Sequence, residues 1–292
     1  MKEEFCTLPD GRRLCYSVFG EGQPLVLIAG LALHMTYWPQ SFLDALTKRG
    51  FRVIVFDNRD VGKSSFMDTP VPGKLDIMLR RAPDGCYRIE DMADDVMLLL
   101  DSLHIQAAHI VGMSMGGMIA QALASHHGDK VLSLTSIFST TGARRVGQPS
   151  MRTMLQLMKG RSSSREASAR AFADMMSLIG GRKYPSSRSR LTDYASKAWD
   201  RSVGDIEAGV ARQIGAIIKS GDRTEALARI KAPTLVVHGD RDLMVHPSGG
   251  RATAAAIKGA RMVILQGAGH DIADRFADRL AGLILENTER AS

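Results

Sequence analysis

The stretch HIVGMSMGGMIAQ, residues 109–121, sets one serine, Ser114, among glycines and methionines at a change of pattern. The apolar run before it, Ala107–Val111, predicts a short strand, and the alanine-rich run Met115–His126 predicts a helix. A serine at such a sharp turn needs a strained backbone, and small neighbours let the strand and the helix approach each other closely. The pattern therefore predicts a nucleophile elbow, with an ordinary tight turn as the alternative.

Apolar strands alternate with helical segments on both sides of this turn. Further strands are predicted at Arg12–Val18, Leu25–Ala29, Arg52–Phe56, Val131–Phe138, Thr234–His238 and Arg261–Leu265. Further helices are predicted at Trp38–Arg49, Glu90–Leu103, Gly250–Ile257 and Ile272–Glu286. Continuous apolar strands separated by helices indicate an α/β fold, with a mostly parallel central sheet and helices on both faces.

The alternation stops between about Gly142 and Ile230. This segment contains two polar stretches that we interpret as loops, RSSSR and YPSSRSR, and helical runs at Met151–Lys159 and Glu166–Ile179. An insertion between two core strands lies above the C-terminal edge of a parallel sheet, where ligands usually bind. We therefore divide the chain into a first core part, a helical cap and a second core part, at residues 1–143, 144–230 and 231–292.

The net charge of +7 is concentrated in the predicted cap. Between Arg144 and Lys231 the chain has 18 Lys or Arg and 8 Asp or Glu, so the remainder is slightly acidic. No aromatic platform or zinc-finger spacing accompanies the basic residues, which argues against a nucleic-acid partner. We expect a solvated basic surface, with attraction of anionic substrates or of a membrane surface as the alternative.

The start of the chain, its apolar stretches and its cysteines predict a cytoplasmic protein without stable membrane association. The start, MKEEFCTLPDG, has no apolar signal region, and the longest apolar stretch, Pro24–Met35, is too short to span a bilayer. Cys6, Cys15 and Cys86 have no metal-ligand spacing, so we expect neither a zinc site nor a disulfide framework. Cys6 and Cys15 flank the turn Pro9–Gly11, where we expect two reduced thiols on a hairpin.

A serine becomes a nucleophile when a base removes its proton and a third group orients that base. Asp240 and Asp242 follow the predicted strand Thr234–His238, and His270 follows the next strand. Because parallel strands end at one edge of the sheet, we expect these side chains near Ser114. We assign the acid to Asp242 and interpret Asp240 as a turn residue; the chain order Ser, Asp, His is that of an α/β-hydrolase.

Two backbone N–H groups are expected to form an oxyanion hole, one after the nucleophile and one after the first central strand. Met115 supplies the first, and Leu31 in LIAGLALH is the candidate for the second. Among the other histidines, His34 and His246 lie in loops near the predicted site, and the remaining five are interpreted as packing or helix-end residues. GKS at residues 62–64 imitates a phosphate loop, but Asp57 stands where that loop needs glycine, so we expect no nucleotide binding.

The sequence resembles the α/β-hydrolase superfamily over nearly its whole length, through AGL, FDNRDVGKSS, GMSMGG, GDRD and GAGHD in that order. More narrowly, DNRDVGKSS, GMSMGGMIAQ and the cap length are similar to bacterial esterases of the aclacinomycin methylesterase kind, which hydrolyse carboxylic esters without a cofactor. The resemblance implies a nucleophile, an acid, a base and two oxyanion-hole amides: Ser114, Asp242, His270, Leu31 and Met115. Many relatives have His-Gly where this chain has Ala29-Gly30, so that histidine's hydrogen bonds are absent here.

These features predict a serine hydrolase that cleaves small to medium hydrophobic carboxylic esters through an acyl-enzyme, with a small-molecule ester as its partner. Lactonase, cofactor-free perhydrolase and C–C hydrolase activities use the same triad and remain alternatives; a non-catalytic ligand receptor is an alternative of a different class. Methionines near the elbow and in the cap suit an adaptable apolar pocket, with core packing as the alternative. They are Met113, Met115, Met118, Met151, Met154, Met158, Met175 and Met176.

Overall fold

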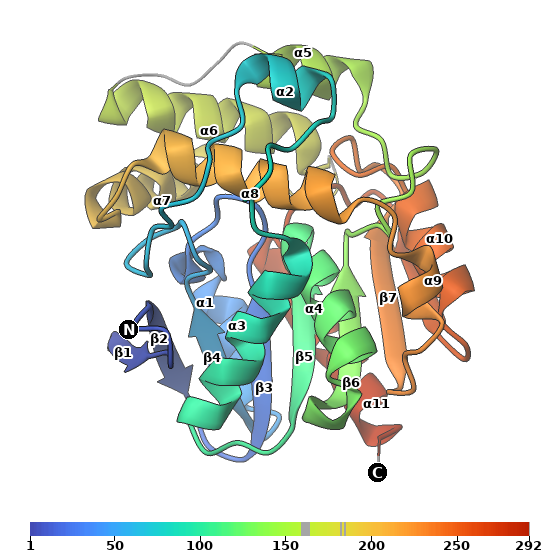
Figure 1. The fold of residues 1–292 in the computed structure, drawn as a ribbon. Helices are drawn as coiled ribbons and strands as arrows, with labels where there is room; N and C mark the ends of the chain where they lie inside the picture. The colour runs from blue at the N-terminus through green and yellow to red at the C-terminus, as the bar shows by residue number, and fades with distance from the viewer. Residues whose placement is uncertain (159–163, 182, 184, 292) are drawn as a thin grey trace.

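The computed structural model describes residues 1–158, 164–181, 183 and 185–291 (Figure 1). One sheet is formed by β1 (Glu4–Thr7), β2 (Arg13–Phe19), β3 (Gln23–Ile28), β4 (Phe51–Phe56), β5 (Ala108–Met113), β6 (Val131–Ile137), β7 (Thr234–Gly239) and β8 (Arg261–Leu265). Their order across the sheet is β1-β2-β4-β3-β5-β6-β7-β8. The pairs β1–β2 and β2–β4 are antiparallel, and all pairs from β4 to β8 are parallel.

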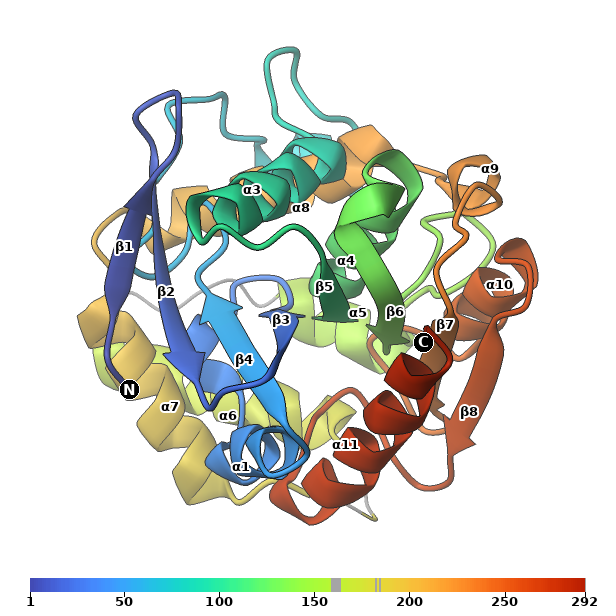
Figure 2. The ribbon, with the colours of Figure 1, turned by 90° about the horizontal axis from the view of Figure 1, so that it is seen from below.

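Helices cover both faces of the sheet (Figure 2). On one face lie α1 (Gln40–Thr47) and α11 (Asp274–Glu289), and on the other lie α3 (Ile89–Ser102) and α4 (Met115–His126). The interior strands are buried on both sides because apolar side chains alternate between these two helical layers. The predicted fold class is therefore confirmed. The other elements outside the cap are α2 (Lys74–Met78), α10 (Ser248–Ala256) and the 3-10 turns η1 (Met35–Tyr37) and η2 (Gly128–Lys130).

The glycines of residues 109–121 bring β5, α4 and β3 into close contact. A Cβ atom at Gly112 would lie 2.1 Å from the carbonyl oxygen of Gly116, and one at Gly116 would lie 2.0 Å from the carbonyl oxygen of Ile28. No side chain fits at such distances, so the backbones approach as closely as the turn requires. The first turn of α4 is thereby packed directly against the end of β3.

The cap lies above the edge at which the parallel strands end (Figure 1). It contains α5 (Met151–Met158), α6 (Arg165–Ile179), α7 (Arg188–Arg201) and α8 (Ile206–Ser220), and α9 (Thr224–Leu227) leads back to β7. Of the predicted run Met151–Lys159, Lys159 lies outside the described residues, as do residues 161–163 of RSSSR. The predicted boundaries at residues 143 and 230 remain a prediction.

The interpretation of YPSSRSR as a loop is wrong at its end, because α7 already begins at Arg188. The hydroxyl of Ser187 accepts a hydrogen bond from the backbone N–H of Arg190 at 3.2 Å, so this serine is the N-cap of the helix. Serine is among the favoured N-cap residues because it satisfies one free N–H of the first turn. A serine-rich stretch here marks a helix start as well as a loop.

Two buried carboxylates of the core bind arginines of the cap. Arg201 of α7 donates to Asp57, which is 0% exposed, and Arg212 of α8 donates to both oxygens of Asp60 at 2.7–3.1 Å. Buried charges need such partners, because an unpaired charge in the interior is strongly destabilising. These two arginines therefore belong to the joint between cap and core, and only the other basic residues of the cap are left for the expected solvated surface.

The N-terminal hairpin was only partly anticipated, since no strand is predicted at Glu4–Thr7. In the structure Cys6 pairs with Leu14 and Cys15 pairs with Phe5, which places the two thiols on opposite faces of the hairpin. All three cysteines are free and buried. In the part of the chain that the structure describes, none of the helices has both the length and the apolar character needed to cross a bilayer.

We expect Gly116→Ala to lower the free energy of unfolding by at least about 2 kcal/mol, because its Cβ overlaps a backbone carbonyl that has no room to move. Gly128→Ala is the matched control: nothing lies within 4 Å of a Cβ there, so its change stays below about 0.5 kcal/mol. Urea unfolding of both variants measures the difference. Equal stability of the two variants would contradict the close approach of α4 to β3.

Candidate active site

Ser114 has the backbone conformation that the sequence predicts for an elbow. Its φ is 57° and its ψ is −119°, a strained combination for a residue with a side chain. Three hydrogen bonds hold it there: its N–H donates to the Ile137 carbonyl at 2.9 Å, and its carbonyl accepts from Met118 N–H at 3.2 Å and from the Ser139 hydroxyl at 2.8 Å. The serine side chain thus stands at the junction of β5 and α4, only partly buried.

The structure brings the three predicted triad residues into one hydrogen-bonded line. Nε2 of His270 lies 2.9 Å from the Ser114 hydroxyl oxygen, and Nδ1 of the same ring lies 2.7 Å from Oδ2 of Asp242. Asp242 follows β7 and His270 follows β8, so both come from the carboxyl edge of the sheet. Such an arrangement can transfer a proton from the serine to the imidazole while the carboxylate holds the ring.

The Asp242 carboxylate is held from both sides. Its Oδ1 accepts hydrogen bonds from the backbone N–H groups of Met244 and Val245 at 2.9 and 2.8 Å, which leaves Oδ2 for the imidazole. Burial by itself would raise the pKa of Asp242, but the charges and hydrogen bonds of His270 and His238 bring it below its ordinary value. The Asp242 carboxyl group is therefore ionised, as it must be to orient the imidazole of His270.

His238 is a residue of this site that the sequence analysis interpreted as packing. It is fully buried in β7, with Nε2 at 2.8 Å from the Val245 carbonyl and 3.4 Å from Oδ2 of Asp242. The acid therefore lies between two imidazoles, His270 and His238. The sequence contained one signal for this contact, the spacing of four residues between His238 and Asp242. That spacing spans the end of β7 and does not by itself show that the following loop folds back onto His238.

The predicted oxyanion-hole residues lie on either side of the serine. Leu31 follows Gly30, where an added Cβ would be 3.2 Å from Cβ of Ser114, so this loop passes directly over the nucleophile. Met115 is the first residue of α4, immediately after Ser114. Among the described residues, no acceptor is found for the N–H of Leu31, and Met115 begins α4, where the first N–H groups have no partner within the helix.

The loop that carries Leu31 is fixed by side chains of the neighbouring segment. Asn58 donates to the carbonyl of Ala29 at 3.2 Å, and the carboxylate of Asp57 accepts from the N–H of Met35 at 2.8 Å. These contacts hold the loop in a chain that has alanine at position 29. They connect the loop after β3 to the segment after β4 within the same edge of the sheet.

His34 belongs to the joint between core and cap. Its ring is buried, with Nδ1 at 3.3 Å from Nη1 of Arg201 and Nε2 at 3.4 Å from the Ser202 hydroxyl oxygen. Burial lowers the pKa of His34 from 6.5 to about 4, so the ring is neutral at neutral pH. Its contacts connect the loop after β3 to α7, whereas His270 is the histidine that lies within hydrogen-bond distance of Ser114.

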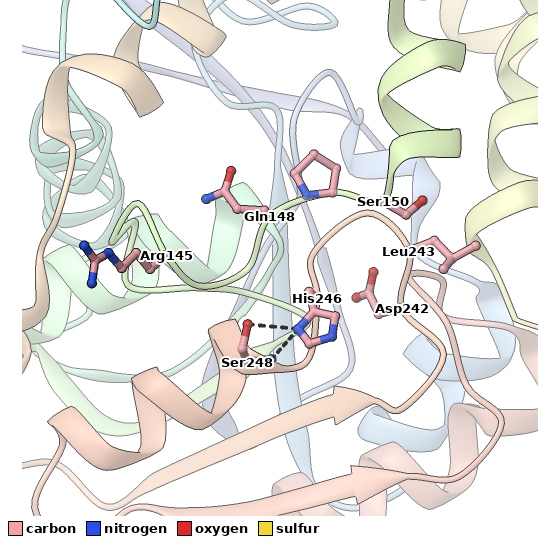
Figure 3. Close-up of a pocket in the computed structure, with 8 residues that line it drawn as sticks. Arg145, Gln148, Ser150, Asp242, Leu243, His246 and Ser248 are labelled. Carbon is pink, nitrogen blue, oxygen red and sulfur yellow. Dashed lines mark hydrogen bonds between the residues drawn. The ribbon is translucent and has the colours of Figure 1, made fainter.

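His246 lines a hollow of about 300 Å³ together with Asp242, Leu243 and Ser248 (Figure 3). Nδ1 of its ring lies 2.9 Å from the Ser248 hydroxyl oxygen. Neither Ser114 nor His270 is among the residues that line this hollow. Among the described residues, the ring of His246 is hydrogen-bonded to Ser248 and not to His270.

The structure describes the surroundings of seven of the eight methionines, and the side chain of Met158 lies outside the described part. Four of them pack in the two apolar cores and two on α5 are exposed, so core packing is observed for four and the adaptable apolar pocket stays a prediction. The buried ones are Met113, Met115, Met118 and Met176, and the exposed ones are Met151 and Met154. Met175 is partly buried against the core. Among the residues that the structure describes, no group of three His, Cys, Asp or Glu side chains is placed to hold a metal ion.

The chain belongs to the α/β-hydrolase fold family, whose model matches residues 23–275. Rhodomycin D methylesterase DauP of Streptomyces sp. (strain C5) is 29% identical, with 92% of each chain covered. A hydrolase from Pseudomonas aeruginosa PA01 superposes with a TM-score of 0.73 at 26% identity, covering 98% of each chain. The enol-lactonase from Burkholderia xenovorans LB400 gives 0.72 at 27% identity, covering 98% of this chain and all of that one. The predicted resemblance to bacterial methylesterases is confirmed, and these relationships support hydrolase activity.

We expect Asp242→Asn to lower kcat by about 10³- to 10⁴-fold, because an amide can present its N–H to Nδ1 of His270 and favour the wrong tautomer. Asp240→Asn is the matched control: its Oδ1 accepts from the N–H of Gly267 at 2.5 Å, and it should lose less than about tenfold. Steady-state ester hydrolysis by both purified variants measures this. If Asp240→Asn were the less active variant, the assignment of the acid would be wrong.

The buried His34 predicts a loss of stability in acid. Because its pKa is about 4 in the folded chain and about 6.5 in the unfolded chain, the unfolded state binds the proton first as the pH falls. This removes about 2–3 kcal/mol from the free energy of unfolding between pH 7 and pH 4.5. Urea unfolding at pH 7 and at pH 4.5 measures this loss, and His34→Gln should lose less free energy of unfolding between the two pH values than the wild type. An equal loss in wild type and variant would refute the prediction.

Proposed function

We propose that this chain is a serine hydrolase that cleaves carboxylic esters of small to medium size and hydrophobic character. The observation that carries the proposal is the hydrogen-bonded line from Ser114 through His270 to Asp242, at the foot of a strained elbow and beneath a cap. The nucleophile lies within hydrogen-bond distance of the base, and the base within hydrogen-bond distance of the orienting acid, which is the arrangement that acyl transfer uses.

In this mechanism the Ser114 oxygen attacks the ester carbonyl while Nε2 of His270 takes the hydroxyl proton. The carbonyl oxygen becomes an oxyanion and accepts hydrogen bonds from the N–H groups of Leu31 and Met115. Collapse of this intermediate breaks the bond to the alcohol, which receives the proton from His270 and leaves an acyl-enzyme. Water then attacks the acyl-enzyme with His270 again as base, releasing the acid and restoring the serine.

Asp242 supports each of these steps without accepting a proton itself. Its ionised Oδ2 fixes Nδ1–H of His270, so that Nε2 presents a lone pair to the serine. When the imidazole becomes an imidazolium, the buried carboxylate stabilises the new charge across 2.7 Å. The mechanism therefore needs only groups of this chain and water, and we propose that it uses no cofactor.

The substrate class is supported by the surroundings of the serine and by the relatives. Apolar residues lie near both the nucleophile and the base, among them Leu31 on the loop after β3 and Phe138, whose ring centroid lies 5.8 Å from that of His270. The similar Streptomyces protein is a rhodomycin D methylesterase by name, which is consistent with an ester of a carboxylic acid. We further propose a small-molecule ester as the partner and a cytoplasmic location.

Lactone hydrolysis is the second candidate activity. A lactone is an internal ester and requires the same nucleophile, base and oxyanion hole, and one of the similar solved structures is an enol-lactonase. Comparing open-chain esters with lactones of equal carbon number separates the two candidates. Perhydrolysis, C–C bond hydrolysis and ligand binding without turnover remain alternatives.

We expect Ser114→Ala and His270→Ala each to lower hydrolysis of p-nitrophenyl esters by at least about 10³-fold, because either change removes covalent catalysis. The matched controls are Ser125→Ala, on the same helix as the elbow, and His246→Ala, next to the outer hollow; both should keep turnover within about threefold. A series of acyl lengths assayed with wild type shows the preferred substrate size. Near wild-type turnover by purified Ser114→Ala would refute the mechanism.

A further inference from the structure

Two side chains of the cap bind the backbone of the oxyanion loop. The N–H of Ala32 donates to Oε1 of Gln213 on α8 at 2.9 Å, and the N–H of His34 donates to the hydroxyl of Tyr194 on α7 at 2.9 Å. Ala32 follows Leu31 directly, so these contacts begin one residue beyond the candidate oxyanion donor. Gln213 and Tyr194 both belong to helices of the cap, α8 and α7.

Ala32 needs such support, because its φ of 60° lies in the left-handed region. Outside glycine this conformation costs free energy and persists where surrounding contacts determine it. Gln213 is 0% exposed, and its Nε2 donates to the carbonyl of Arg59 at 2.8 Å while its Oε1 accepts from Ala32. The two bonds together fix which way the amide faces, and they join the oxyanion loop to the segment after β4.

The register of α8 delivers Gln213 to this position. A Cβ at Gly209 would lie 2.4 Å from the carbonyl of Asp60, so the helix touches the core backbone there. One turn later Arg212 forms its buried ion pair with the Asp60 carboxylate. Gln213, the next residue, is therefore held by two neighbouring contacts that leave α8 little freedom to shift.

Tyr194 is held in a similar way from α7. Its ring packs against those of Tyr37 and Phe172, with centroids 5.1 and 5.2 Å away. The ring contacts place the hydroxyl, and the hydroxyl accepts the N–H of His34. Removing the hydroxyl alone would leave the aromatic packing intact, which makes this contact separable by a single substitution.

We propose that Gln213 and Tyr194 are positioning residues of the oxyanion hole, through which the cap holds the N–H of Leu31 over Ser114. The inference rests on the proposed function and goes further, because it makes the cap a part of the catalytic geometry. Oxyanion stabilisation depends on donors that are already in place before charge develops. A loop that loses its cap contacts would bind the substrate carbonyl but stabilise the transition state less well.

The test compares Gln213→Met and Tyr194→Phe with two matched controls. Gln121→Met removes a buried glutamine of α4 that donates to the Ser136 hydroxyl, and Tyr16→Phe removes a hydroxyl that donates to Glu4. We expect Gln213→Met to lower kcat about 10- to 100-fold and Tyr194→Phe about 3- to 10-fold, below the effect of losing a donor outright. KM should stay within about twofold, and the controls should keep the wild-type kcat.

A trifluoromethyl ketone of the best ester separates positioning from general damage to the fold. The serine oxygen adds to the carbonyl carbon of this ketone and forms a hemiketal oxyanion, which mimics the transition state. The corresponding methyl ketone does not form this adduct and remains a carbonyl ligand. We expect the inhibition constant of the trifluoromethyl ketone to rise by the factor by which kcat/KM falls in each variant. The constant of the methyl ketone should remain within about twofold of wild type.

Each result decides the matter. Unchanged kcat in Gln213→Met and Tyr194→Phe, or a fall in kcat with an unchanged constant for the trifluoromethyl ketone, would overturn the inference while leaving the proposed function intact. If Gln213→Met does not fold, Tyr194→Phe gives the same decision, since it keeps the ring. A folded wild type that neither hydrolyses esters nor binds the trifluoromethyl ketone would refute the proposed function itself, and this inference with it.

Discussion

The backbone of Ser114 is the constraint on which the candidate site depends. Its φ of 57° turns the chain from β5 into α4 so sharply that the hydroxyl stands clear of both elements. That conformation is costly for serine, and the cost is offset by hydrogen bonds to Ile137, Met118 and Ser139 and by the close approach at Gly116. The same turn presents the N–H of Met115 and places the hydroxyl 2.9 Å from His270.

The cap is tied to the core through charge as well as packing. Asp57 and Asp60 are buried carboxylates of the core, and each finds its arginine on a cap helix, Arg201 or Arg212. Removing an arginine would leave a buried charge unpaired, so these pairs fix where the cap sits more than they add to net stability. Part of the positive excess of the cap is thereby used inside the protein.

The elements that sequence could predict are those with local signals. Strand alternation, the glycines of the elbow and the positions of Asp242 and His270 after strand ends are all local patterns, and the fold class that follows from them is confirmed. Contacts between distant segments left no such signal. The pairing of Gln213 with Ala32 joins residues 181 positions apart, and His238 reaches Asp242 only because the acid loop folds back. The methionines show why composition alone does not define a pocket, because apolar residues near a site also pack in the core.

The proposal that Ser114 is a nucleophile activated by His270 is tested by the reaction of the wild-type protein with an alkyl p-nitrophenyl phosphonate, followed by mass spectrometry of its peptides. We expect release of one p-nitrophenol per chain and a single phosphonyl adduct on the peptide that contains Ser114. An adduct on another side chain, or no reaction by the folded protein, would contradict it.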